Sequence, residues 1–228
     1  MEKAFSSLPD ECWAPGATWF IDIGGAPIPY FLGILGYLRN KFPSPQLTIF
    51  NPTGTYGEEP WKYSFTSGLD THMWVPYLWG HPELILPRTY VFLLGFEGER
   101  SYEVFYQCEP DRVKALVAKP GYESEYEGMP ISRNKLFLEE TALSGSSLIE
   151  ANAADPVETW TKLEQVVAEE KDKSNVVFVP LGPKAHAFGS GLCALTDGAP
   201  AVLYHMPRTY RVRDVKRGRH LWKYEISL

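Results

Sequence analysis

The sequence predicts an α/β fold, in which a Rossmann-like and mainly parallel sheet of about six strands carries helices on both faces. The clearest evidence is the apolar run of residues 176–181, which is rich in β-branched side chains and too short for a helix, so it indicates a strand buried on both faces. Gly182 and Pro183 interrupt it, small and apolar residues then recur at helical spacing, and residues 201–204 form another apolar run. This succession predicts a right-handed βαβ unit with parallel strands.

The N-terminal part of the chain repeats this pattern. Residues 18–23 predict a strand that ends in the Gly24-Gly25 pair. Pro27 suits the first turn of a following helix, where its missing N–H costs little. Residues 46–50 predict the next strand. A β-α-β order again implies a parallel sheet.

The middle of the chain contains elements of both kinds. Apolar runs predict strands at residues 89–94 and 112–118, and the spacing of apolar positions predicts helices at residues 99–108, 131–143 and 146–153. Asp155 and Pro156 predict the start of one more helix, because an aspartate accepts hydrogen bonds from the first free N–H groups and proline fits the first turn.

Two segments depart from this alternation. Residues 55–88 are rich in Trp, Tyr, Gly and Pro without a sustained period, so we expect an aromatic insertion that forms a lid or an edge element. In residues 207–228, two alternating stretches flank a basic Lys-Arg-Gly-Arg run, which predicts a C-terminal β-hairpin with a solvated tip. We expect a single domain over residues 1–228, with its core at residues 17–206.

Length and composition favour a globular, cytoplasmic protein. The 228 residues are 44% hydrophobic and 14% aromatic, enough to bury a core without cross-links. The three cysteines are widely spaced and typical of a reducing compartment. The first ten residues lack the pattern of a signal peptide, and the most apolar window contains Asp22 and two prolines, so no membrane partner is expected. A net charge of −6 argues against duplex nucleic acid as a partner.

Polar residues and glycines follow most of the predicted strands. Because ligands bind beyond the carboxyl ends of the strands in open parallel sheets, we expect these residues to share one crevice. They are Asp22, Gly24, Gly25, Asn51, Thr53, Gly95, Glu97, Gly98, Arg100, Lys119, Tyr122, Gly182, Lys184, His186 and Ser190.

The turn of Gly182, Pro183 and Lys184 is the most informative part of this set. A helix N-terminus carries partial positive charge and free N–H groups, and the lysine adds a full charge, so we expect phosphate or carboxylate to bind there. The alternative is a helix-starting turn with a solvated lysine, since one Gly-x-Lys is not a Walker loop.

Further ligand-binding candidates surround that turn. Gly24 and Gly25 allow a close approach of backbone to ligand, or form a plain turn between strand and helix. Gly95 belongs to a Gly-x-x-Gly fragment of a dinucleotide fingerprint, and His186 lies one turn into the last helix. The predicted ligand-binding residues are therefore Gly24, Gly25, Gly95, Gly182, Lys184 and His186.

Asp22 and Glu97 are the candidate catalytic residues, because a carboxylate at a strand end can act as a general base or a nucleophile. The alternative is structural: Asp22 caps a helix or pairs with Lys184, and Glu97 pairs with Arg100. The five histidines and three cysteines show no metal-binding spacing, so neither a metal nor another cofactor is expected.

The apolar strand, the Gly182-Pro183-Lys184 turn and the small-residue helix together resemble the strand–G(T/P)K–helix signature of CRISPR-associated Rossmann-like (CARF) ligand-sensing domains. In that family the lysine and the turn backbone contact oligonucleotide phosphates, and the loop after the first strand, here residues 24–26, contributes. The resemblance implies a sensor in bacterial antiviral defence that forms a homodimer and acts through an effector protein. Proline replaces the commoner threonine of the turn, and no nuclease or helix-turn-helix effector follows.

Three hypotheses about function result. In the first, a nucleotide or oligonucleotide second messenger binds at the strand ends, and Trp61, Trp74 or Tyr122 stacks on a base. The second is a small hydrolase or transferase of nucleotides or nucleosides that uses Asp22 or Glu97. The third is a non-catalytic accessory subunit that docks another protein through residues 55–88.

Overall fold

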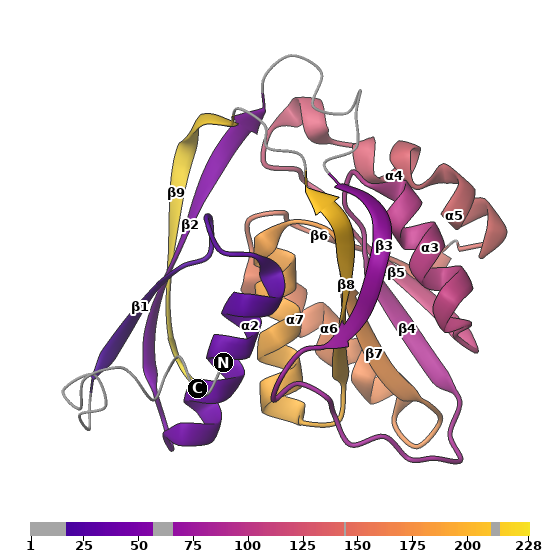
Figure 1. Ribbon diagram of the computed structural model, residues 1–228, viewed down its shortest axis with the longest axis horizontal. Coiled ribbons are helices and arrows are strands. Elements are labelled where there is room, and N and C mark those ends of the chain that lie inside the picture. Colours follow the sequence, from indigo (N-terminus) through magenta and orange to yellow (C-terminus); the bar gives the residue numbers. More distant parts are fainter. Residues whose placement is uncertain (1–16, 57–65, 144, 211–214) are drawn as a thin grey trace.

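The computed structural model describes residues 17–56, 66–143, 145–210 and 215–228, and its strands form two sheets (Figure 1). The larger sheet has the order β3 (Thr66–Trp74), β8 (Ala201–Tyr210), β7 (Asn175–Pro180), β4 (Arg88–Leu93), β5 (Arg112–Ala118) and β6 (Leu148–Ala151). The smaller sheet has the order β1 (Thr18–Asp22), β2 (Gln46–Tyr56) and β9 (Val215–Ser227).

The larger sheet is mainly parallel, as predicted. Its strands from β8 to β6 all pair in parallel, and β3 adds an antiparallel edge beside β8. The chain proceeds outward from β4 through β5 to β6, then crosses back to β7 and continues to β8 on the other side. The strand order therefore reverses between β4 and β7. In sheets of this kind the crevice for a ligand opens at that point.

The assignment of strands to the sheet differs from the sequence-based expectation. The first β-α-β unit does not extend the large sheet, because β1 pairs in parallel with β2 and β2 pairs with β9. The predicted hairpin of residues 207–228 is wrong. Strand β8 continues to Tyr210 along β3, whereas β9 runs antiparallel to β2, with Ile49 opposite Tyr224. Alternating residues identify a half-buried strand but not its partner.

Two further predictions need correction. Residues 146–153 are not a helix: a 3-10 turn, η3 (Gly145–Ser147), leads into β6, which gains its hydrogen bonds from β5. Residues 131–143 do not form one helix but α4 (Met129–Arg133) and α5 (Lys135–Glu140). They meet at Asn134, whose side-chain N–H groups donate to the carbonyl oxygens of Gly95 and Pro130. Of the predicted insertion, residues 57–65 lie outside the described part and residues 66–74 form β3.

Helices cover both faces of the large sheet, as expected. Helices α2 (Ile28–Lys41) and α7 (Lys184–Asp197) lie between the two sheets, and α6 (Pro156–Glu170) lies beside α7 (Figure 1). The opposite face carries α3 (Gly98–Cys108), α4 and α5, preceded by the short turn η2 (Ser124–Tyr126). Among the described residues, no helix has both the length and the apolar character that a bilayer crossing requires.

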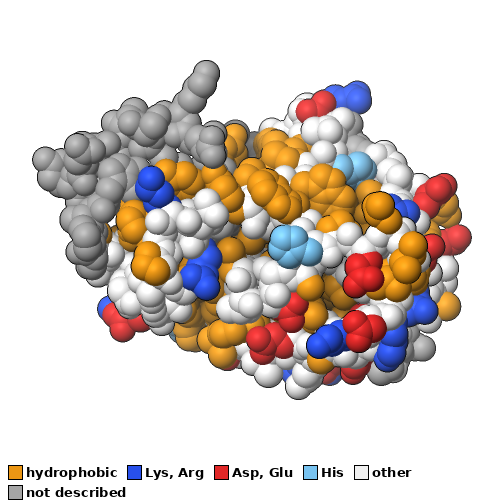
Figure 2. All heavy atoms as spheres, turned by 90° about the horizontal axis from the view of Figure 1, so that it is seen from below, with side chains coloured by type: hydrophobic (Ala, Val, Ile, Leu, Met, Phe, Trp, Pro, Cys, Tyr) orange, Lys and Arg blue, Asp and Glu red, His pale blue; other side chains and the backbone are white. Residues whose placement is uncertain are grey.

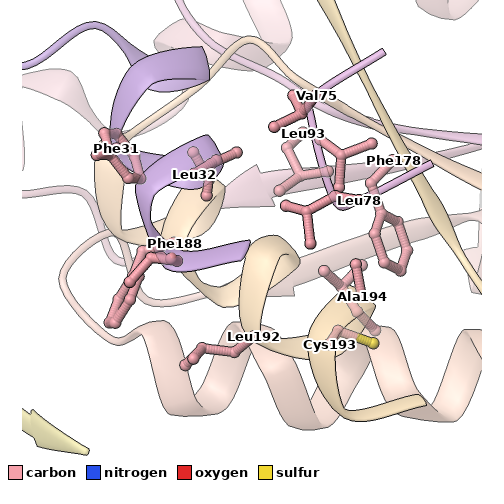
Figure 3. Close-up of a cluster of buried hydrophobic side chains, with 14 of the residues drawn as sticks. Phe31, Leu32, Val75, Leu78, Leu93, Phe178, Phe188, Leu192, Cys193 and Ala194 are labelled. Atoms are coloured by element: carbon pink, nitrogen blue, oxygen red, sulfur yellow. The ribbon is translucent and has the colours of Figure 1, made fainter. Parts of the chain in front are cut away.

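The hydrophobic core has two parts, one on each face of the large sheet. Between the sheets, Phe31 of α2, Phe188 of α7 and Phe178 of β7 are fully buried and pack together with their neighbours (Figure 3). On the other face, the rings of Phe92 and Phe137 lie 4.7 Å apart. Burying each such side chain contributes about 1.5–3 kcal/mol. Burial on both faces explains the continuous apolar runs of β4 and β7.

The predicted start of α6 is confirmed. One carboxylate oxygen of Asp155 accepts hydrogen bonds from the backbone N–H groups of Val157 and Glu158, each 2.9 Å long. Asp155→Ala should therefore lower the free energy of unfolding in urea by about 1 kcal/mol, whereas Asp155→Asn, which keeps the acceptor, should remain close to the wild type. Equal losses in both variants would contradict a capping role.

Candidate functional site

A cavity of about 600 Å³ lies where the order of the parallel strands reverses. Its walls come from the segments that follow β4, β5, β6 and β7 and from the far half of β2, so the two sheets enclose it together. The volume suits a small-molecule ligand, since such sites usually measure about 300–1,000 Å³. The lining residues that carry the argument below are Asn51, Phe96, Tyr122, Tyr126, Lys184 and Lys216.

Lys184 joins the two sheets at this cavity. Its ammonium donates to the backbone carbonyl oxygens of Gly24 and Ala26, the second at 2.8 Å, so the turn before α7 holds the loop before α2. Burial lowers the pKa of Lys184, and the nearby carboxylate of Asp22 opposes this change. An ammonium has three N–H donors, so two serve the fold and one remains for a ligand.

The predicted glycines have mainly packing roles. A Cβ atom on Gly182 would lie 2.5 Å from the carbonyl oxygen of Leu94, and one on Gly95 would collide with the carbonyl oxygen of Leu181. These two glycines therefore let the loops after β4 and β7 meet at the cavity. Gly24 lines the cavity and packs against Pro52 in the same way, whereas Gly25 faces open space and does not line it.

Helix N-termini give the cavity a positive potential. The first residues of α2 and α7 and the residue before α3 all belong to its lining. Within the described residues, the N-caps of these three helices, Pro27, Glu97 and Pro183, make no side-chain capping hydrogen bond. The first N–H groups of α3 and α7 therefore keep their capacity to attract an anion, whereas in α2 Pro29 has no N–H and Tyr30 donates to the carbonyl oxygen of Pro27.

Glu97 lines the cavity, but its carboxylate is committed to structural contacts. One oxygen accepts from the backbone N–H and the hydroxyl of Thr66, at 2.7 and 2.8 Å, and the other lies 3.1 Å from Arg100. Arg100 in turn donates to the carbonyl oxygen and to Nδ1 of His205. Of the two roles left open by the sequence, the structure shows the pairing with Arg100. The network ties the loop after β4 to β3 and β8.

The other catalytic candidate also has a local role. A carboxylate oxygen of Asp22 accepts a hydrogen bond of 2.7 Å from the backbone N–H of Gly24, which shapes the loop after β1. Asp22 does not belong to the cavity lining. Neither carboxylate is thus arranged as a free base facing the cavity.

His186 lies outside the cavity lining and inside the core. It is fully buried in α7, and its Nε2 lies 3.1 Å from the carbonyl oxygen of Asn152. Burial lowers the pKa of His186 to about 4, although hydrogen bonds to backbone carbonyls oppose this change. The imidazole is therefore neutral near pH 7 and donates its Nε2 proton to Asn152.

Several lining residues were missed by sequence reasoning. Phe96 and the buried Tyr126 form an aromatic wall, with ring centroids 5.6 Å apart, and Tyr122 also lines the cavity. Only Tyr122 was among the predicted stacking residues: Trp74 is half exposed on β3 away from the lining, and Trp61 lies outside the described residues. Phe96 is the second residue after the predicted strand of residues 89–94, which was a usable signal.

Lys216 of β9 reaches the cavity, although the sequence placed it in the tip of a hairpin. Its position depends on the pairing of β9 with β2, where Lys216 lies opposite Thr55. The side chain is exposed, so its charge is available at the cavity mouth. No local pattern in the sequence indicates this placement.

No protein-family model matches the chain, and no curated protein sequence matches it significantly. Function is therefore inferred from the residues around the cavity. In the part of the chain that the structure describes, His, Cys, Asp and Glu side chains form no group of three able to hold a metal ion.

The low pKa of His186 predicts a stability that depends on pH. An unfolded histidine takes up a proton near pH 6.5, whereas folded His186 resists protonation down to about pH 4. Below pH 6.5 the unfolded state binds more protons, so the free energy of unfolding falls as the pH decreases. His186→Gln keeps an N–H donor for Asn152 but does not titrate.

Urea unfolding at pH 7 and pH 5 should therefore show a smaller loss of stability in His186→Gln than in the wild type, by about 2 kcal/mol. His205, whose pKa is lowered to about 3 by burial and by Arg100, contributes to the dependence that remains. The same pH dependence in variant and wild type would contradict a neutral, buried His186.

Proposed function

We propose that the chain is a ligand-sensing domain that binds a phosphate-bearing small molecule, of the size of a nucleotide, in the cavity. The observation that supports this most directly is the position of the cavity. Numbered along the chain from β4, the parallel strands lie in the order 3-2-1-4-5. This is a Rossmann-like order, and domains with that order bind nucleotides where it reverses.

The charges around the cavity favour an anion. Three residues of its described lining are positively charged: Lys184, Lys216 and Arg100. Glu97 is the one carboxylate in that described lining, and it is paired with Arg100. Three helix N-termini add to this positive potential although the whole chain has a net charge of −6. Helix N-termini and lysines together form common phosphate sites.

Binding is favoured over catalysis, because both carboxylates proposed as catalytic groups already serve the fold. The sequence resemblance to ligand-sensing domains agrees with a sensor. The role in bacterial antiviral defence, a homodimer and an effector partner remain predictions that rest on that resemblance.

Lys216→Ala tests the anionic end of the site. Loss of this exposed charge should weaken the binding of a nucleoside monophosphate about tenfold, as measured by calorimetry, which corresponds to about 1.4 kcal/mol. Lys171→Ala is the matched control, because this exposed lysine follows α6 at the amino ends of the strands. Lys184→Ala is less suitable, since it also removes two hydrogen bonds that hold the fold.

Two results would contradict the proposal. One is the failure of AMP, CMP, GMP and ribose 5-phosphate alike to bind the wild-type protein. The other is the same affinity in Lys216→Ala and Lys171→Ala.

A second candidate function is supported by an exposed apolar surface. In the connection between β3 and β4, Trp79, Leu84 and Ile85 are 56%, 101% and 89% exposed. Figure 2 shows that hydrophobic side chains gather on the face that this connection crosses. Such surfaces mark sites of protein interaction. We propose that this surface docks another protein, foremost a second copy of the chain.

The turn that presents Leu84 and Ile85 is held in one conformation. The side chain of Asn175 accepts from the backbone N–H of Glu83 and donates to the carbonyl oxygens of Glu83 and Leu86, at distances of 2.8 to 3.1 Å. A turn fixed in advance loses little entropy when a partner covers it.

Leu84→Glu should therefore convert a homodimer into a monomer in analytical ultracentrifugation. Leu136→Glu is the matched control, because Leu136 is also strongly exposed, at 72%. It lies on α5, which covers the face of the large sheet opposite to α2 and α7. A wild-type protein that stays monomeric up to about 100 μM, well above the Kd of a stable dimer, would contradict self-association through this surface.

A further inference from the structure

The cavity contains a nearly buried amide. Asn51 of β2 is 3% exposed and belongs to the cavity lining. Its Nδ2 donates a hydrogen bond of 3.0 Å to the hydroxyl oxygen of Tyr122.

The carbonyl oxygen of the Asn51 side chain has no partner within the fold. Among the described residues, no donor forms a hydrogen bond with Oδ1, and this atom is not one of the unpaired side-chain atoms that are sealed from solvent. Oδ1 is therefore open to the cavity, where a ligand that supplies an N–H group can replace a water molecule.

This acceptor lies at the aromatic end of the cavity. Tyr122, its direct hydrogen-bond partner, shares the lining with Phe96 and with Tyr126. Lys216 lies opposite Thr55, four residues farther along β2, which is roughly 13 Å at the rise of a strand. The rings therefore suit a nucleobase, while Lys184 and Lys216 supply the positive charge that its phosphate requires.

Building on the proposed function, we propose that Asn51 Oδ1 accepts a hydrogen bond from the exocyclic amino group of a nucleobase that stacks against Phe96 and Tyr122. The ligand class is then an amino-bearing nucleotide, with adenine, cytosine or guanine as its base. Asn51 is the residue that selects it.

Matched pairs of nucleotides test this selection by calorimetry. Each pair differs by the amino group: AMP and purine riboside 5′-monophosphate, CMP and pyrimidin-2-one riboside 5′-monophosphate, GMP and IMP. In at least one pair the amino-bearing member should bind the wild type about fivefold to tenfold more tightly, as one neutral hydrogen bond allows. Asn51→Ala should abolish that preference.

Ribose 5-phosphate separates this inference from the function it builds on, because it carries the phosphate but no base. Its affinity should stay the same in Asn51→Ala and fall in Lys216→Ala. If ribose 5-phosphate binds while the two members of every nucleotide pair bind the wild type with equal affinity, the role of Asn51 is wrong and the phosphate site stands. The same conclusion follows if the preference for the amino-bearing nucleotide survives in Asn51→Ala. If no probe binds the wild type, both proposals fail. The comparison of nucleotide pairs can be made with the wild-type protein alone. It therefore tests the inference even if Asn51→Ala folds poorly.

Discussion

The contact between the Lys184 ammonium and the carbonyl oxygens of Gly24 and Ala26 is the interaction on which the site depends. It joins the smaller sheet to the turn after β7, and the cavity exists because the two sheets meet there. Removing an ammonium from water is costly, and the lowered pKa of Lys184 reflects that cost. Charge-assisted hydrogen bonds to two carbonyls offset it. The lysine is therefore a structural group first, with one donor left for a ligand.

The remaining polar groups of the cavity divide into those that build it and those that face its contents. Glu97 and Arg100 tie the loop after β4 to β3 and β8, and Gly95 and Gly182 let the loops after β4 and β7 meet. Buried polar groups that satisfy one another in this way make a site rigid. Asn51 differs, because its Nδ2 donates to Tyr122 whereas its Oδ1 accepts from no described residue.

The cavity and the exposed apolar turn lie at opposite ends of the larger sheet. The cavity follows the carboxyl ends of its parallel strands, whereas the turn with Leu84 and Ile85 directly precedes β4. Helix α7 connects the two regions. It begins at Lys184, and just after its end the carbonyl oxygen of Ala199 accepts a hydrogen bond from the backbone N–H of His81, beside Trp79. One helix thus joins the proposed ligand site to the proposed docking surface.

The sequence by itself determined the elements whose signals are local. The apolar runs located β4, β7 and β8, Asp155 located the start of α6, and the list of strand ends already contained Asn51, Tyr122 and Lys184. These signals are local because burial, capping and turn geometry depend on neighbouring residues. The tertiary structure alone decided that β1 and β2 leave the large sheet, that residues 148–151 join it as β6, and that β9 brings Lys216 to the cavity. A strand pattern shows which face is buried, but the partner is chosen by packing between residues far apart in the chain.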